Sequence, residues 1–224
     1  MAVSAIIFDC DGTLVDTEIM SARIDVAYFS RRGIHFKDEH DYLAQFMGIA
    51  KIDIVKKLNA QYGTHISADE FQDEFASGMI GRIPYDMNFF PESVEVVRSL
   101  VARGLKLAVA SNGQRQAVLE ELRVPGYLDL IGADHVFAVQ DAANPKPAPD
   151  LYLAAARKLG VEPGSCLVVE DSVPGARGGV AAGMNVVGYT GFAHDKVGTE
   201  KRLLEAGCFK VIKILPELSG LIAR

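Results

Sequence analysis

The stretch that decides the fold lies near the amino terminus and reads Ala5-Ile6-Ile7-Phe8-Asp9-Cys10-Asp11-Gly12-Thr13-Leu14-Val15-Asp16. Its apolar run predicts a buried central strand of a parallel sheet. Side chains alternate along a strand, so Asp9 and Asp11 are expected to point one way and Cys10 the other. Gly12 would let the chain turn at the strand's end. Neighbouring carboxylates are costly unless a cation, a proton or donor groups offset them, so the pair marks a candidate site. Taken alone, the two acids could instead cap a turn.

Composition limits the class of protein. The chain has 224 residues and a formal net charge of -6, which argues against a nucleic-acid or anionic-membrane partner. No apolar run is long enough to cross a bilayer, and the amino-terminal apolar stretch, broken by Asp9, does not resemble a signal peptide. Cys10 and Cys166 fall in apolar patterns and are expected to be small buried residues. The three cysteines, Cys10, Cys166 and Cys208, are odd in number and share no metal-ligand spacing. Small buried cysteines fit a reducing compartment, so we expect the cytoplasm as the default.

Residues 17 to 85 carry helical patterns with no strand pattern between them. Helices are expected from Asp16 or Thr17 to about Arg32, and over about 38–46, 51–62 and 67–82. Ile83-Pro84-Tyr85 and Phe89-Phe90-Pro91 would form a return linker, because proline restricts the backbone. The sequence thus predicts two domains: residues 1–16 with 86–224, and a helical insertion at 17–85.

From Pro91 onward, helices and strands alternate. Helices are expected over about 91–103, 114–122, 149–159 and 174–182, and strands over 105–110, 136–139, 166–169, 185–189 and about 210–212. This alternation predicts an α/β fold, a doubly wound parallel (Rossmann-like) sheet with right-handed crossovers. The signatures G-x-G-x-x-G after the first strand and G-x-x-x-x-G-K-[ST] are absent from the sequence. A run of glycines, Gly175, Gly178, Gly179 and Gly183, is expected to allow close packing of a helix on the sheet.

Ligands of such sheets bind beyond the carboxyl ends of the strands, and polar clusters follow several of them. Ser111-Asn112-Gly113 comes after an expected strand, where a hydroxyl and main-chain N–H groups would suit a phosphate oxygen. For this cluster alone, an ordinary helix N-cap serine is the simpler interpretation. Lys146 lies among three prolines, which would fix its ammonium as a point charge for a phosphoryl group. The alternative is a surface lysine in a proline-rich loop.

Glu170-Asp171-Ser172 ends another expected strand and offers two acids to a hard cation. The alternative is helix N-capping by Asp171 or Ser172. Asp9, Asp11, Glu170 and Asp171 would together bring four negative charges into one site. Mg²⁺ and Lys146 would supply three positive charges, and protonation of Asp11 would leave the site close to neutral before a phosphate dianion enters.

The four motifs, Asp9-x-Asp11-Gly12-Thr13, Ser111-Asn112, Lys146 and Glu170-Asp171, resemble in order those of the haloacid dehalogenase (HAD) superfamily. The helical insertion looks like the cap of the β-phosphoglucomutase-like branch. Within that branch, the first two motifs look most like those of small bacterial sugar-phosphate phosphatases, including the 6-phosphogluconate phosphatase type. The resemblance implies a Mg²⁺-dependent phosphatase for a small phosphorylated metabolite, a monomer or weak homo-oligomer without nucleic-acid or membrane partners.

The resemblance also implies roles for single residues. Asp9 would attack phosphorus and become an aspartyl-phosphate, and Asp11 would serve as acid and then as base. Lys146 would neutralise charge on the phosphoryl oxygens. Asp9, the main-chain carbonyl of Asp11 and Asp171 would bind Mg²⁺, with Glu170 direct or through water. The expected contacts to phosphate or substrate are Thr13, Ser111, Asn112 and, in the cap, Lys51.

Departures from the family pattern bear on the reaction. Asp11 argues against phosphonate cleavage and true dehalogenation, because those relatives lack this acid. The mutases carry a cap histidine where we align Ser21, and a cap lysine where this chain has Met47, just before Gly48. A phosphatase is therefore favoured over a β-phosphoglucomutase-like isomerase. A receiver-like phospho-accepting signalling module is a more distant alternative, because such modules also group acids, a hydroxyl and a lysine around Mg²⁺.

Overall fold

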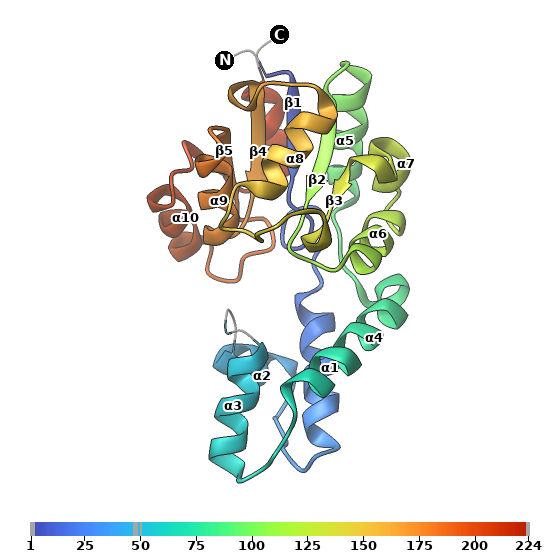
Figure 1. Cartoon of the computed structure of the whole chain (residues 1–224), viewed down its shortest axis with the longest axis vertical. Helices are drawn as coiled ribbons and strands as arrows, with labels where there is room; N and C mark the ends of the chain where they lie inside the picture. Colours follow the sequence, from blue (N-terminus) through green and yellow to red (C-terminus); the bar gives the residue numbers. More distant parts are fainter. Residues whose placement is uncertain (1–2, 47–48, 50, 223–224) are drawn as a thin grey trace. The chain divides into compact units, whose positions relative to one another are not determined.

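The computed structural model describes residues 3–46, 49 and 51–222 of the chain. The chain forms two compact units (Figure 1). The first, here called the core unit, comprises Met1–Asp16 and Asn88–Arg224, and the second, the helical unit, comprises Thr17–Met87. The chain thus leaves the core unit after its first strand and returns before its second.

The core unit is built on a six-stranded sheet in the order β3-β2-β1-β4-β5-β6, with every pairing parallel. The predicted doubly wound α/β fold is confirmed. The central strand β1 is fully buried along its whole length, as its apolar run predicted. The strands are β1 (Ala5–Phe8), β2 (Lys106–Ala110), β3 (Val136–Phe137), β4 (Cys166–Glu170), β5 (Asn185–Tyr189) and β6 (Lys210–Ile212).

Helices cover the sheet because alternate residues of each strand face opposite sides. Ala5 and Ile7 of β1 and Val168 of β4 pack with the apolar faces of α8, α9 and α10 in one hydrophobic cluster. Figure 1 shows α8 and α9 lying across the strands of the core unit. The core-unit helices are α5 (Pro91–Ala102), α6 (Arg115–Arg123), α7 (Tyr127–Ile131), α8 (Asp150–Leu159), α9 (Val173–Ala181) and α10 (Lys196–Glu205), with 3-10 turns η1 (Ala133–His135), η2 (Val139–Asp141), η3 (Pro163–Ser165) and η4 (Leu215–Gly220).

The register of the central strands brings the polar clusters to one edge. Phe8 pairs with Val109 of β2 and with Val169 of β4, so the three strands end side by side. The main-chain N–H of Asp9 continues this pairing by donating to the carbonyl of Val169, 2.9 Å away. The segments after β1, β2 and β4 therefore meet, as expected for the carboxyl ends of parallel strands.

The predicted close packing is confirmed for Gly175, Gly178 and Gly179 of α9 but not for Gly183, which lies beyond the helix with φ 73°. A methyl group on Gly179 would lie 2.8 Å from Cγ2 of Val186, and one on Gly178 would lie 3.1 Å from the carbonyl oxygen of Ala148. One on Gly175 would lie only 1.7 Å from Oε1 of Glu170. Because the side chain of glycine is a single hydrogen atom, this face of α9 can approach β4 closely.

The helical unit contains α1 (Glu18–Ser30), α2 (Glu39–Phe46), α3 (Lys51–Tyr62) and α4 (Ala68–Asp86). Its centre is aromatic: Phe29 and Phe71 have ring centroids 4.9 Å apart, and Tyr42 and Phe46 lie 5.1 Å apart. These side chains are buried in one hydrophobic cluster and form the packing core of the helices. Ser67 caps α4 by accepting the N–H of Glu70.

The expected end of the last cap helix was wrong. Helix α4 runs on to Asp86 through Pro84, so Ile83-Pro84-Tyr85 is helical and not a linker. Ile83 is fully buried there. The stability gained by packing Ile83 exceeds the cost of the main-chain hydrogen bond that Pro84 cannot donate. Helices α7 and α10 had no counterpart in the sequence analysis. Met47 and Gly48, on which the comparison with the mutases partly depended, lie outside the described residues.

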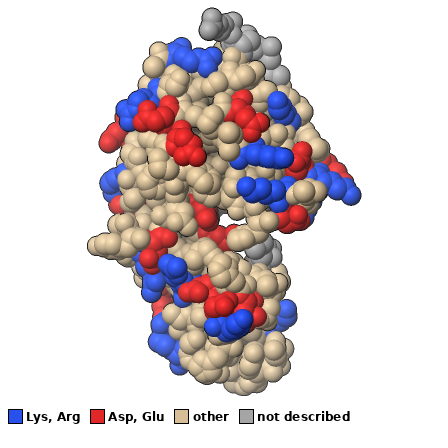
Figure 2. Space-filling model, turned by 180° about the vertical axis from the view of Figure 1, so that it is seen from behind, with Lys and Arg blue, Asp and Glu red and all other residues tan. Residues whose placement is uncertain are grey.

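The surface mixes both signs of charge. On the face drawn in Figure 2, basic and acidic side chains are interspersed over the core unit and over the helical unit. Among the described residues, no helix is both long enough and apolar enough to traverse a bilayer.

Candidate active site

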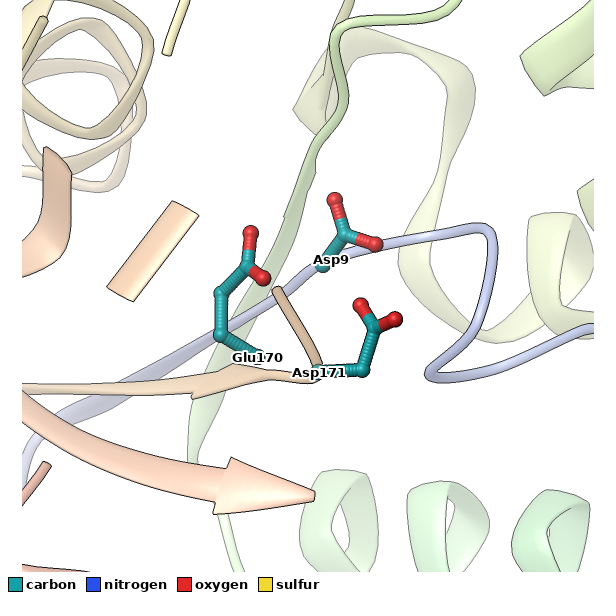
Figure 3. Close-up of side chains that lie close together, drawn as sticks. All are labelled: Asp9, Glu170 and Asp171. Carbon is teal, nitrogen blue, oxygen red and sulfur yellow. The ribbon is translucent and has the colours of Figure 1, made fainter. Parts of the chain in front are cut away.

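Three carboxylates converge where β1 and β4 end. Asp9, Glu170 and Asp171 each place one oxygen within 4.8 Å of the other two (Figure 3). Asp9 follows β1 directly, Glu170 is the last residue of β4, and Asp171 comes next in the chain. Glu170 is fully buried and Asp9 is nearly so. The structure thus brings together acids separated by about 160 positions in the sequence.

Lys146 joins this group from the loop before α8. Its Nζ lies 2.5 Å from Oδ1 of Asp9 and 2.6 Å from Oε1 of Glu170. The residue is only 6% exposed, so the alternative of a surface lysine is wrong. The side chain of Asn112 holds the loop in place: its Oδ1 accepts the N–H of Lys146 at 2.9 Å, and its Nδ2 donates to the Lys146 carbonyl at 3.2 Å.

Glu170 uses both of its oxygens in hydrogen bonds. Oε1 accepts from Nζ of Lys146 and from the hydroxyl of Tyr152, 2.9 Å away. Oε2 accepts from the N–H of Ser172 at 3.0 Å and from its hydroxyl at 2.8 Å. Ser172 also caps α9 by accepting the N–H of Gly175, so the N-capping alternative holds for Ser172. Four donors around one carboxylate fix its orientation.

The electrostatics of the group favour a bound cation. Burial raises the pKa of Asp9 to about 8, opposed by the positive charge of Lys146 and reinforced by Glu170. Burial raises the pKa of Asp171 well above its ordinary value, and the charges of Glu170 and Asp9 add to this. Burial lowers the pKa of Lys146, but Asp9 and Glu170 outweigh it and raise that pKa well above its usual range. Three ionised carboxylates and one ammonium leave two negative charges, which a divalent cation with oxygen ligands would balance.

The residues predicted to hold phosphate lie around this group with different partners. Thr13 is fully buried, and its hydroxyl donates to Oδ1 of Asp171 at 3.4 Å. The hydroxyl of Ser111 accepts the N–H of Gly113 at 3.0 Å. Because α6 begins at Arg115, Ser111 is not its N-cap, and that alternative is wrong. The Asn112 side chain binds the main chain of Lys146 through Oδ1 and Nδ2, and its contact with phosphate stays a prediction.

Asp11 lies beyond the end of β1, and the expectation that its side chain points the same way as that of Asp9 stays a prediction. Strand β1 ends at Phe8, so strand alternation does not extend to Asp11. Asp11 is exposed in a turn in which Gly12 has φ 82° and donates its N–H to the Val15 carbonyl at 2.7 Å. Its carboxylate is not one of the three that form the close group. Its charge nevertheless contributes to the raised pKa values of Asp9 and Asp171.

Lys51 belongs to the helical unit, where it has its own partners. Its Nζ lies 2.5 Å from Oδ2 of Asp25 and 3.3 Å from the hydroxyl of Ser21. Asp25 is buried, and its Oδ2 also accepts from the hydroxyl of Tyr42 at 2.7 Å. The ammonium of Lys51 is therefore neutralised within its own unit, and substrate contact by Lys51 stays a prediction.

Two buried polar residues beside the group were missed. Tyr152 sits in the apolar stripe of α8, and nothing in its spacing distinguishes it from core. Glu121 lies on the buried face of α6 with Val118 and Leu122, and its Oε2 is 3.4 Å from the thiol of Cys10. An acid at an apolar position of a helix was a visible signal for Glu121.

Glu121 should make stability depend on pH. Burial, with the charge of Asp11, raises the pKa of Glu121 from 4.5 to about 7. As pH rises above 4.5, the unfolded chain loses this proton before the folded chain does, so folding becomes less favourable. We expect Glu121→Gln to raise the free energy of unfolding by up to about 3 kcal/mol at pH 8 and to change it little at pH 4.5. Urea unfolding at the two pH values measures this, and an equal shift at both would contradict it.

The comparisons agree with this geometry. A curated relative, 6-phosphogluconate phosphatase of Escherichia coli (strain K12), is 27% identical over 218 residues, which cover 96% of this chain and 94% of the relative. Protein SUPPRESSOR OF QUENCHING 1, chloroplastic, of Arabidopsis thaliana is 33% identical over 83% of this chain, which spans only 18% of that protein's length. A solved HAD family hydrolase from Deinococcus radiodurans R1, with bound phosphate and sodium, is 31% identical with a TM-score of 0.78, covering 99% of this chain and 95% of the other.

A protein-family model also matches most of the chain. The model of the haloacid dehalogenase-like hydrolases matches residues 3–183, which include every polar cluster at the strand ends. The order of the motifs, the parallel sheet and the convergence of Asp9, Lys146 and Asp171 fit that match. The resemblance expected from the sequence is confirmed: this chain belongs to the haloacid dehalogenase-like hydrolase family.

Proposed function

We propose that the protein is a phosphatase that hydrolyses a small phosphorylated metabolite, a sugar or sugar-acid phosphate, through an aspartyl-phosphate on Asp9. The observation that carries the proposal is the buried ammonium of Lys146 between Asp9 and Glu170, at the edge where the strands end. An ammonium held there can balance charge on a phosphoryl group while an oxygen of Asp9 attacks phosphorus. The name of the Escherichia coli relative supports a phosphorylated sugar acid as one substrate class.

The reaction has two steps on this chain's own residues. In the first, a carboxylate oxygen of Asp9 forms a bond to phosphorus while the bond to the substrate's alkoxide oxygen breaks, and Asp11 gives that oxygen a proton. In the second, Asp11 takes a proton from water, whose oxygen displaces the carboxylate and releases inorganic phosphate. The exposed position of Asp11 in its turn leaves it accessible to the leaving group and to water. Thr13 and Ser111 would hold phosphoryl oxygens.

The acidic group fits Mg²⁺ as the cofactor. Oxygen donors within 4.8 Å of one another and two unbalanced negative charges suit a hard divalent cation. Asp9, Asp171 and the main-chain carbonyl of Asp11 would bind it, and the four donors around Glu170 favour contact through water for that residue. When bound, the ion would lower the charge repulsion between the carboxylates and the incoming phosphate.

The decisive experiment is phosphate release from a panel of phosphorylated sugars and sugar acids with Mg²⁺. We expect inorganic phosphate to appear with at least one member, while the dephosphorylated product appears in equal amount. If the substrate changes into an isomeric phosphosugar and total organic phosphate stays constant, the chain is an isomerase of the β-phosphoglucomutase type. If no member loses phosphate, and phosphorylated Asp9 persists for minutes to hours, the receiver-like alternative gains support.

Removal of Mg²⁺ should remove both activity and a part of the stability. Ethylenediaminetetraacetic acid is expected to abolish phosphate release, and added Mg²⁺ to restore it. A cation that binds only the folded chain stabilises it by about 2.7 kcal/mol at a concentration of 100 Kd, because binding shifts the folding equilibrium. The melting temperature should therefore rise with Mg²⁺ and not with Na⁺ at equal ionic strength. An unchanged melting temperature, with activity unaffected by the chelator, would contradict the metal site.

A further inference from the structure

Tyr152 is a buried neighbour of the charged residues Glu170 and Lys146. It is fully buried in the first turn of α8, and its hydroxyl donates to Oε1 of Glu170 at 2.9 Å. The same aromatic ring has its centroid 5.0 Å from Nζ of Lys146. One side chain therefore contacts both members of the buried ion pair, one through its hydroxyl and the other through its ring.

The hydroxyl fixes the oxygen that holds the lysine. Oε1 of Glu170 accepts from Lys146 and Tyr152 together, while Oε2 is held by Ser172. With both oxygens engaged, the carboxylate cannot rotate without losing bonds to buried donors. The ammonium of Lys146 then has a defined place, 2.5 Å from Oδ1 of Asp9.

Helix α9 leaves room for this arrangement. A methyl group on Gly178 would lie 3.2 Å from Cε2 of Tyr152, and one on Gly175 would overlap Glu170. Tyr152 and Glu170 therefore fill space that side chains at Gly178 and Gly175 would otherwise occupy. Loss of one hydroxyl would leave the ring in place and change the hydrogen bonding alone.

We propose that Tyr152 is a positioning residue that, through Glu170, holds the ammonium of Lys146 against Asp9. The proposal deepens the proposed phosphatase function and depends on it for the kinetic effect. Tyr152 contacts Glu170 through its hydroxyl and Lys146 through its ring, and it would act on the reaction through these two residues. Its hydroxyl sets the position of the charge that balances the phosphoryl oxygens as the bond to Asp9 forms.

The first test measures the position of Lys146 without any substrate. Trace labelling with acetic anhydride, read by mass spectrometry, compares the rate at Lys146 with that at Lys201, whose side chain is 79% exposed. We expect Tyr152→Phe to raise the relative labelling rate of Lys146 about fivefold, because the ammonium leaves its carboxylates more often. Tyr28→Phe removes another buried hydroxyl, one without a hydrogen-bond partner among the described residues, and serves as the control.

The second test measures the reaction. At saturating Mg²⁺ we expect Tyr152→Phe to lower kcat about tenfold and to leave KM within about twofold, because the charge on the phosphoryl oxygens grows in the transition state. The Mg²⁺ concentration for half-maximal rate should stay within about twofold of the wild-type value. Tyr28→Phe should change none of these quantities.

The outcomes separate the alternatives. Unchanged labelling of Lys146 and unchanged kcat, with only a lower melting temperature, would show a structural role and overturn the proposal. A higher requirement for Mg²⁺ with full kcat at saturation would show action through the metal and overturn it as well. If the wild-type chain releases no phosphate from any substrate, the proposed function fails, and labelling still decides whether Tyr152 positions Lys146.

Discussion

Phosphate release should fall by at least about 10,000-fold when Asp9 is replaced by asparagine, because the variant has no carboxylate to attack phosphorus. An amide has nearly the same shape and keeps an oxygen to accept from Lys146, so the site should stay packed. Burial raises the pKa of Asp9 to about 8, so the ionised acid is unfavourable in the fold without a cation, and asparagine removes that cost. The loss of activity should therefore come without loss of folding.

The control is the same aspartate-to-asparagine substitution at a position outside the candidate active site. Asp134 has a side chain that is 87% exposed and lies 3.9 Å from Lys158 in an ion pair. Asp134→Asn should keep full phosphate release and the wild-type melting temperature, since exposed ion pairs contribute about 0–1 kcal/mol. Rates are measured with the substrate found in the panel, and folding by circular dichroism. Equal rates for Asp9→Asn and the wild type would remove the nucleophile from the mechanism.

Much of the fold could be predicted because the relevant patterns are local. The apolar run before Asp9 defined β1, and the alternation of helices and strands after Pro91 defined the parallel sheet. The end of α4 could not be read in the same way. Pro84 is a local signal for a helix end, whereas the burial of Ile83 that keeps the segment helical is a tertiary contact.

The same distinction between local sequence patterns and tertiary contacts applies to the candidate site. Asp9 and Asp171 directly follow strands, and Lys146 lies in a proline-rich loop; all three belong to recognisable motifs, so the sequence could group them. The hydrogen bond from Tyr152 to Glu170 depends on how α8 crosses the sheet, which no spacing in the sequence records. The hydrogen bonds between the Asn112 side chain and the main chain of Lys146 show the same limit, because they join loops that lie far apart in the sequence.

Gly175 is the position at which a single methyl group should disturb this site most. Its added Cβ would lie 1.7 Å from Oε1 and 2.4 Å from Oε2 of Glu170. Glu170 cannot yield easily, since it is fully buried and both its oxygens are bound. We expect Gly175→Ala to displace this carboxylate, to lower kcat at least about 100-fold and to lower the free energy of unfolding by about 2–4 kcal/mol.

A matched glycine and a second variant distinguish this clash from general effects of alanine. Gly81 lies within α4, and an added Cβ there would meet no described atom within 4 Å beyond its chain neighbours and the adjacent helix backbone. Gly81→Ala should therefore keep activity and stabilise the fold by about 0.5–1 kcal/mol. Combining Gly175→Ala with Glu170→Ala makes room for the methyl group, and the losses in stability should then be less than additive. Activity should stay low in the double variant, because Lys146 has lost the carboxylate that holds it beside Asp9. Additive losses would show that Gly175 acts on α9 itself, independently of Glu170.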